Sequence, residues 1–103
     1  WNQSLAEHYA KAFDIPLQRP IPQLSKGNLT KLHLIHSLAR GAELLVLDEP
    51  TDGLDAIASE EAMQALVTIV AEQGVTVLIC SHRLEELEKI ADHVCLVHRG
   101  QCL

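Results

Sequence analysis

The chain has 103 residues, a length that suits one small domain or part of a larger one. Hydrophobic residues make up 48% of it, which excludes wholesale disorder, and aromatic residues only 3%, so the core must be aliphatic. Eight lysines and arginines against fourteen aspartates and glutamates give a formal net charge of −6, which argues against nucleic acid as a partner because such a surface needs a basic stripe.

The three cysteines, Cys80, Cys95 and Cys102, stand in aliphatic surroundings. An odd number in such surroundings predicts free thiols in a reducing compartment, with Cys80 and Cys95 in the core. No apolar run approaches the ~18 residues of a membrane span, and the N-terminus lacks a signal-peptide pattern. These features predict a cytoplasmic protein that is still able to dock on a membrane partner.

The first part of the chain predicts two helices separated by a proline-rich loop. Residues 4–13 form the first predicted helix, and the three prolines of DIPLQRPIPQ each bias the preceding residue away from helix. Apolar residues then recur at helical spacing from Asn28 to Arg40, which predicts a second helix that Gly41 ends.

The rest of the chain predicts strands that alternate with helices. ELLVLD, VTVLIC and HVCLVH are short apolar runs bounded by turn residues, as expected of buried strands. One helix is predicted from its cap Asp55 to Gly74, and another begins at Ser81. This order predicts an α/β fold with a parallel sheet, helical crossovers, and strands buried on both faces.

Polar residues follow the first two predicted strands at the point where each ends. Asp48 and Glu49 follow the first, and Ser81 and His82 follow the second. Ligands of open parallel sheets bind at the carboxyl ends of the strands, so these side chains are expected to converge. A carboxylate there can hold Mg²⁺, and its neighbour can deprotonate a water. The alternative is a strand that simply ends in solvated acids.

LLVLDEPTDGLD, from Leu44 to Asp55, resembles the Walker B motif and D-loop of ABC-type ATPases. Upstream, LSKGN resembles their LSGGQ signature motif, and downstream, VLICSH resembles the strand and switch histidine of the same family. The three motifs occur in the family's order. The resemblance implies a partial P-loop NTPase fold without the Walker A portion. Residues 1–23 would then be the end of the helical subdomain with a proline-rich linker, and residues 24–103 the C-terminal part of the ATP-binding domain.

The resemblance also implies ATP and Mg²⁺ as cofactors in the complete protein. Asp48 would support the Mg²⁺ ion, and Glu49 would activate the attacking water as the catalytic base. His82 would contact the γ-phosphate and hold the water and the base in line. Phosphoryl transfer needs chiefly positioning and charge neutralisation, and these groups supply both.

The signature residues would bind an ATP held mainly by a second subunit. Ser25 would offer its hydroxyl and Gly27 its backbone N–H to the γ-phosphate, and Asp55 would lie at the subunit interface. Lys26 and Asn28 depart from the family's glycine and glutamine. Lys26 adds a positive charge near the expected phosphates, while the shorter Asn28 puts in doubt any contact that the glutamine amide makes.

No G-x-x-x-x-G-K-[ST] sequence occurs in the chain, so nothing cradles the β-phosphate, and the chain alone is expected neither to bind ATP tightly nor to hydrolyse it. The resemblance implies the ATP-hydrolysing subunit of an ABC transporter, with export favoured by LSKG. It would work as a head-to-tail dimer on a transmembrane permease subunit, peripheral on the inner face of the cell membrane. An ABC ATPase of translation or DNA repair and a non-catalytic interaction fragment remain as alternatives.

Three simpler interpretations apply to single features. Ser25 can be an ordinary helix N-cap, His82 can be a helix-start residue, and the charged run from Arg83 to Lys89 is expected to be a solvated helix face. In the family, the Walker A strand lies between the VTVLIC and HVCLVH strands. Its absence predicts that these two strands either pair directly or, as the favoured outcome, pair between copies of the chain.

Overall fold

The computed structural model describes all residues from 1 to 103. Helices and strands alternate after an N-terminal helical portion, as expected of an α/β fold. The elements are α1 (Gln3–Ala12), the 3-10 turn η1 (Ile21–Gln23), α2 (Lys26–Ala39), β1 (Leu44–Asp48), α3 (Ala56–Gln73), β2 (Thr76–Cys80), α4 (Leu84–Ile90), β3 (Val97–His98) and β4 (Gln101–Cys102). None of these helices is both long and apolar enough to cross a membrane.

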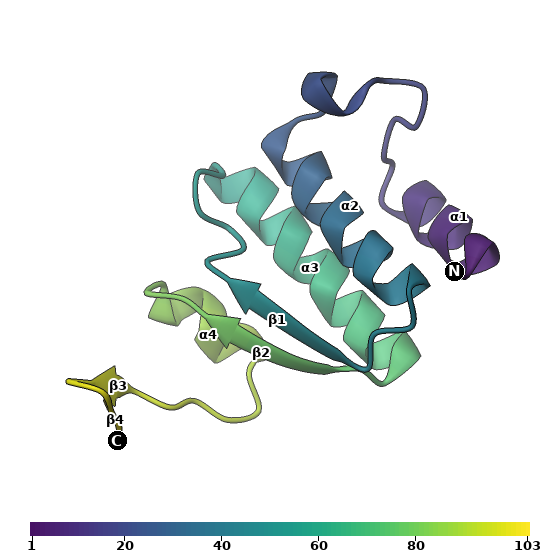
Figure 1. The fold of residues 1–103 in the computed structure, drawn as a ribbon. Helices are drawn as coiled ribbons and strands as arrows, with labels where there is room; N and C mark the ends of the chain where they lie inside the picture. Colours follow the sequence, from purple (N-terminus) through teal and green to yellow (C-terminus); the bar gives the residue numbers. More distant parts are fainter.

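The central sheet consists of β1 and β2, which pair in parallel. Leu44 lies opposite Thr76 and Asp48 lies opposite Cys80, so the carboxyl ends of both strands meet at one edge of the sheet. Helix α3 forms the crossover between the strands, and α4 starts close to this edge (Figure 1). The predicted parallel sheet with a helical crossover is therefore confirmed.

Helices α2 and α3 lie side by side over one face of the sheet, and α1 packs on α2 (Figure 1). Leu45 of β1 is 3% exposed and points into this layer, and Leu47, Val77 and Ile79 pack against the same core. Every buried member of the core except Leu45 comes from the helices or the loop after α1. The core residues are Tyr9, Ala10, Ile15, Leu34, Ile35, Leu38, Leu45, Leu66 and Ile69.

The opposite face of the sheet is open. Leu44, Val46 and Leu78 on this face are 53%, 66% and 61% exposed. The prediction of strands buried on both faces is wrong for β1 and β2, because helices cover only one face. Each strand alternates between covered and open positions, although four of its five residues are apolar.

The predicted third parallel strand, HVCLVH, is wrong. Residues 91–96 are irregular, and β3 pairs antiparallel with β4 in a separate hairpin. Arg99 and Gly100 have φ of 51° and 77°, the left-handed conformations that tight hairpin turns require. This turn places Gln101 beside His98, so the strand finds its partner locally and leaves β2 unpaired on that side.

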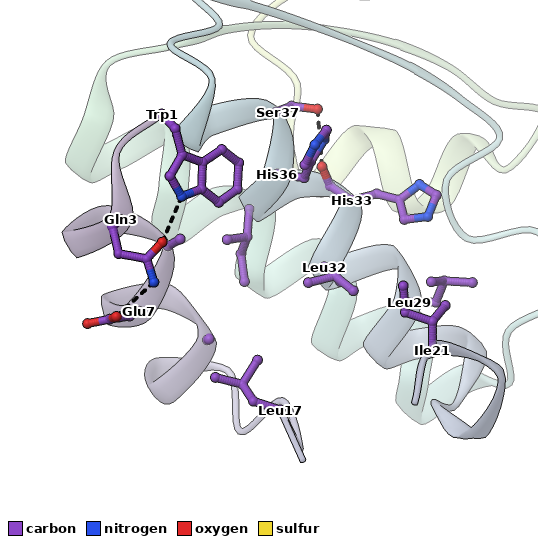
Figure 2. Close-up of a pocket in the computed structure, with 13 residues that line it drawn as sticks. Trp1, Gln3, Glu7, Leu17, Ile21, Leu29, Leu32, His33, His36 and Ser37 are labelled. Carbon is purple, nitrogen blue, oxygen red and sulfur yellow. Dashed lines mark hydrogen bonds between the residues drawn. The ribbon is translucent and has the colours of Figure 1, made fainter. Parts of the chain in front are cut away.

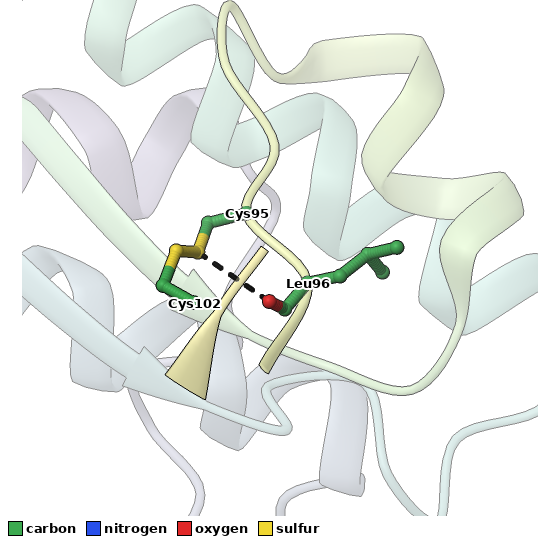
Figure 3. The surroundings of a disulfide bond; sticks show 3 residues. All are labelled: Cys95, Leu96 and Cys102. Carbon is green, nitrogen blue, oxygen red and sulfur yellow. Dashed lines mark hydrogen bonds between the residues drawn. A yellow bond between two sulfur atoms is a disulfide. The ribbon is translucent and has the colours of Figure 1, made fainter. Parts of the chain in front are cut away.

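The cysteines also depart from expectation. Cys95 and Cys102 are joined by a disulfide across the base of the hairpin, as Figure 3 shows, and only Cys80 is a free thiol. Both Cys80 and Cys95 are exposed. The predictions of core positions for Cys80 and Cys95, and of free thiols for Cys95 and Cys102, are therefore wrong. Core positions for Cys80 and Cys95 were predicted from a sheet covered on both faces, which the fold does not form.

Helix α3 has the predicted ends, whereas α2 and α4 differ at their starts. Asp55 caps α3, and Gly74 ends it with φ of 65°. Helix α2 begins at Lys26 because Ser25 supplies the cap. Helix α4 begins at Leu84 and not at Ser81, because the Ser81 hydroxyl accepts the N–H of Arg83 in a local turn at 3.0 Å.

Candidate functional site

Glu49 and His82 meet at the carboxyl edge of the sheet. Glu49 directly follows β1, and its Oε1 lies 3.0 Å from Nδ1 of His82, in the segment after β2. The same oxygen accepts the backbone N–H of His82 at 3.1 Å. The backbone N–H of Glu49 in turn donates to the carbonyl of Cys80 at 2.8 Å. The two strand ends thus bring together an acid and a histidine that are far apart in sequence.

The backbone of Glu49 is in the left-handed region, with φ of 47°. A residue other than glycine adopts this backbone conformation at a cost of about 1–3 kcal/mol, and such strain is concentrated at functional sites. The bonds to Cys80 and His82 hold the conformation in place. The second carboxylate oxygen, Oε2, is buried and has no hydrogen-bond partner.

The hydrogen bond from the His82 side chain is the main cause that lowers the pKa of the Glu49 carboxyl. Partial burial opposes this effect, while the charges of His82 and Arg83 and the backbone bond from His82 add to it. The Glu49 side chain is 32% exposed and that of His82 is 72% exposed. Glu49 is therefore held as a carboxylate, the form that a proton-accepting group needs.

Asp48 ends β1 on the open side of the sheet and is exposed. No group of three or more histidine, cysteine, aspartate or glutamate side chains is arranged to hold a metal ion. Mg²⁺ often binds proteins through one or two carboxylates, with waters and substrate phosphates as its other ligands. A single exposed carboxylate at a strand end fits that kind of site.

Ser25 is the N-cap of α2, and its Oγ accepts the N–H of Asn28 at 3.1 Å. The simpler interpretation of Ser25 as a helix cap is thus confirmed, and it leaves the N–H groups of Lys26 and Gly27 without partners in the chain. Gly27 is buried, and a Cβ added there would lie 3.3 Å from the Cβ of Ala58. Packing between the starts of α2 and α3 therefore also favours glycine at this position.

The signature segment lies beside the predicted D-loop. A Cβ added to Gly53 would lie 3.4 Å from Nζ of Lys26, so the lysine extends along that loop. Asp55 closes the loop, and its Oδ1 accepts the N–H of Ala58 at 2.8 Å. The residues predicted at the site thus form two groups, the signature segment with the predicted D-loop and the Glu49–His82 pair. No side-chain hydrogen bond joins the two groups, but the backbone N–H of Asp52 donates to the carbonyl of Glu49 at 3.1 Å.

The sequence missed a set of side chains that connect the Glu49 turn to α4. Thr51 is 1% exposed, and its hydroxyl donates to Oε2 of Glu86 at 2.7 Å. Arg83 reaches Oε1 of Glu86 at 3.4 Å and Oγ of Ser59 at 3.5 Å. The prediction of a solvated face is wrong for Arg83 and Glu86, whose side chains are 33% and 23% exposed. No spacing rule signals a partner for Thr51 so far along the chain.

A separate groove of about 510 Å³ lies between α1, α2 and the loop that joins them (Figure 2). Leu17, Leu29 and Leu32 line it, and Trp1 stands at one end, where its indole N–H donates to Gln3 at 2.8 Å. None of the residues predicted at the site lines this groove.

The parallel strands and the acid–histidine pair where they end define an α/β protein of the class that has a polar site at the carboxyl edge of a parallel sheet. Three curated relatives are similar to this chain in sequence, and each is named as an ATP-binding protein of a transporter or of transport. The ABC transporter ATP-binding protein YtrB of Bacillus subtilis is 37% identical over 94 residues, which are 91% of this chain and 32% of the relative. The bacitracin transport ATP-binding protein BcrA of Bacillus licheniformis is 37% identical over 83 residues, 81% of this chain and 27% of the relative. The lantibiotic transport ATP-binding protein SrtF of Streptococcus pyogenes is 37% identical over 86 residues, 84% of this chain and 37% of the relative.

Solved structures show the same fold. A metal-chelate type ABC transporter in an inward-facing conformation matches 97% of this chain and 41% of its own with a TM-score of 0.86 at 22% identity. An ATP-binding cassette of an ABC transporter in its ADP conformation matches 97% of this chain and 40% of its own with a TM-score of 0.85 at 22% identity. No family model matches the chain.

The chain therefore belongs to the ABC-type ATPase family, as its three motifs predict. It spans about a third of the length of the curated relatives that it matches, 32% in the case of YtrB.

Proposed function

We propose that the chain is the part of an ABC transporter's ATP-hydrolysing subunit that carries the signature motif, Walker B, the D-loop and the switch histidine. Residues 1–23 are the end of its helical subdomain, and residues 24–103 are the C-terminal part of its ATP-binding domain. The observation that carries the proposal is the Glu49–His82 pair, joined at 3.0 Å where two parallel strands end.

In this proposal Glu49 accepts a proton from the water that attacks the γ-phosphate of ATP. Its lowered pKa keeps it ionised, the form that can take the proton. His82 keeps the carboxylate in place and has its exposed ring available to a phosphate oxygen. Asp48 would hold Mg²⁺, which supplies charge neutralisation at the phosphates when it is bound.

The signature segment would bind the γ-phosphate of an ATP held by a second subunit in a head-to-tail dimer. The free N–H groups of Lys26 and Gly27 and the positive end of α2 suit an anion, and the Lys26 ammonium adds a full charge. Asn28 has its N–H bonded to Ser25, so only its side chain remains for the ligand. Asp55, beside this segment, would lie at the subunit interface.

The partner in the membrane would be a transmembrane permease subunit, with this subunit on the cytoplasmic face. BcrA and SrtF are named for bacitracin and lantibiotic transport, which supports a transporter, with export as the favoured direction. The 103-residue chain alone would neither bind ATP tightly nor hydrolyse it, because it contains no G-x-x-x-x-G-K-[ST] sequence for the β-phosphate.

The complete protein that carries this chain tests the proposal through Ser25. Ser25→Asp keeps a good helix cap but places a negative charge where the γ-phosphate would bind, whereas Ser25→Asn keeps the cap without the charge. We expect Ser25→Asp to lower MgATP turnover and ATP-dependent dimerisation by about tenfold or more, and Ser25→Asn to stay within about threefold of wild type. Equal activity in both variants would remove the signature segment from ATP binding.

A further inference from the structure

The Thr51–Glu86–Arg83 set lies between the two segments that present Glu49 and His82. Thr51 follows Glu49 by two residues, and Arg83 directly follows His82. The Glu86 carboxylate binds both, since its Oε2 accepts from the Thr51 hydroxyl at 2.7 Å and its Oε1 from Arg83 at 3.4 Å. One side chain on α4 is thus bonded to the turn after β1 and to the segment after β2.

Two of the hydroxyl groups in these contacts are buried, so the loss of a partner would be costly. Thr51 is 1% exposed and Ser59, the second partner of Arg83, is 4% exposed. A buried hydroxyl that loses its partner is costly, and a hydrogen bond to a carboxylate is stronger than one between neutral groups. The exposed side of the Glu49–His82 pair has no comparable support, because the His82 side chain is 72% exposed.

We propose that Glu86, through Thr51 and Arg83, is the positioning residue that holds Glu49 and His82 together at the strand ends. No other side-chain hydrogen bond from α4 reaches the turn after β1. Glu86 itself makes no hydrogen bond to Glu49 or His82, so it acts on the pair through Thr51 and Arg83. The expected effect of Glu86 on ATP hydrolysis rests on the proposed function. Its role in holding Glu49 and His82 together does not.

Two readouts keep the positioning role and the proposed function apart. The first is hydrogen exchange of the His82 backbone N–H, which donates to Oε1 of Glu49 at 3.1 Å and therefore reports whether the pair is held. The second is the steady-state rate of MgATP hydrolysis by the complete protein. Removing a positioning group lowers kcat and leaves KM for ATP unchanged when ATP binding does not depend on the pair.

Four variants of the complete protein supply the comparison. Thr51→Val removes the hydroxyl at nearly constant side-chain volume, whereas Thr51→Ser keeps the hydroxyl. Glu86→Gln removes the charge that holds Arg83. Glu85→Gln is the matched control, because Glu85 is the neighbouring acid on α4, is exposed and makes no hydrogen bond or ion pair.

We expect the His82 amide to exchange about tenfold faster in Thr51→Val and Glu86→Gln, and kcat to fall by a similar factor at constant KM. Thr51→Ser and Glu85→Gln should stay within about twofold of wild type. Unchanged exchange at Ile69, which lies within α3 and is fully buried, shows that each variant is folded. If Thr51→Val does not fold, Glu86→Gln decides alone.

A His82 amide that exchanges less than about threefold faster in the folded variants overturns the positioning role, whatever the turnover. Faster exchange in a protein that hydrolyses no ATP, even as wild type, upholds the positioning role and contradicts the proposed function instead.

Discussion

At the scale of single residues, Glu49 combines a strained backbone with an ionised side chain. The cost of its φ of 47° is offset by the hydrogen bonds to Cys80 and His82. The hydrogen bond from the His82 side chain also lowers the pKa of the Glu49 carboxyl. The same interaction that keeps the group ionised therefore also stabilises its unusual conformation. Stability and acidity at this residue are coupled through one hydrogen-bonded pair.

This coupling predicts a pH dependence of stability. Because the folded-state pKa of Glu49 is lowered, its stabilising contribution is complete above about pH 4.3, the ordinary pKa of glutamate, and is lost as the pH falls through the lowered value. Urea unfolding of wild type and Glu49→Gln should therefore show a stability difference that shrinks as the pH falls from 7 toward about 3. Glu60→Gln, at an exposed acid of α3 without hydrogen bonds, should show no such change. A difference that grows on acidification would contradict the lowered pKa.

Sequence reasoning at this scale succeeded where the place of a residue after a predicted strand, or its residue type, decides its position. The convergence of Glu49 and His82 followed from their places after two parallel strands, and Ser25 as a cap followed from its residue type. The left-handed conformation of Glu49 and the burial of Thr51 could not be predicted, because both depend on contacts with residues more than thirty positions away in the chain.

At the scale of elements, α3 is the longest helix of the fold, with 18 residues. Asp55 caps its first turn, Gly74 ends it in the left-handed conformation, and its inner side supplies Leu66 and Ile69 to the core. These end signals are local in sequence, which is why both ends of α3 could be predicted. The predicted D-loop leads into this helix, and Asp55 is held in place as the helix cap.

The structural role of Asp55 can be separated from its proposed role at a subunit interface. Asp55→Ala removes the acceptor for the Ala58 N–H and should lower the free energy of unfolding by about 1 kcal/mol, while Asp55→Asn keeps the cap and should change it little. Thermal unfolding measures both. If the complete protein with Asp55→Asn is as stable as wild type but loses ATP-dependent dimerisation, the carboxylate acts at the interface. An Asp55→Ala variant as stable as wild type would contradict the capping role.

Strands were harder to predict than helices because an apolar run does not specify its partner. VTVLIC and HVCLVH look alike in composition, yet only the first joins the parallel sheet. The turn at Arg99 and Gly100 gives the second a nearer partner, and a hairpin closes a shorter loop than a helical crossover does. The same local pairing places Cys95 and Cys102 within reach of each other.

At the scale of the whole molecule, the sheet has one covered face and one open face. Leu44, Val46 and Leu78 form an apolar strip on the open face, and β2 has an unpaired edge toward the hairpin. Direct pairing of the VTVLIC and HVCLVH segments, one of the two predicted ways of closing that edge, does not occur. An exposed apolar face beside a free edge favours association with another chain.

The 103-residue chain is therefore expected to self-associate. Sedimentation equilibrium at several concentrations should show a dimer or higher oligomer, and Leu78→Lys should shift it toward monomer because a charge then interrupts the apolar strip. Ile57→Lys is the control, since Ile57 is 74% exposed on α3 rather than on the sheet. A wild-type chain that remains monomeric at high concentration would refute the association.

The most direct test of the proposed function is the rate of MgATP hydrolysis by the Glu49→Gln variant of the complete protein that carries this chain. Glutamine preserves the shape of the side chain but cannot accept the proton of the attacking water. We predict that MgATP hydrolysis falls by about 10²–10⁴-fold, while the dissociation constant of ATP stays at its wild-type value. Hydrolysis is measured as phosphate release under saturating MgATP. A rate within twofold of wild type would contradict the role of Glu49 as the proton acceptor and with it the proposed function.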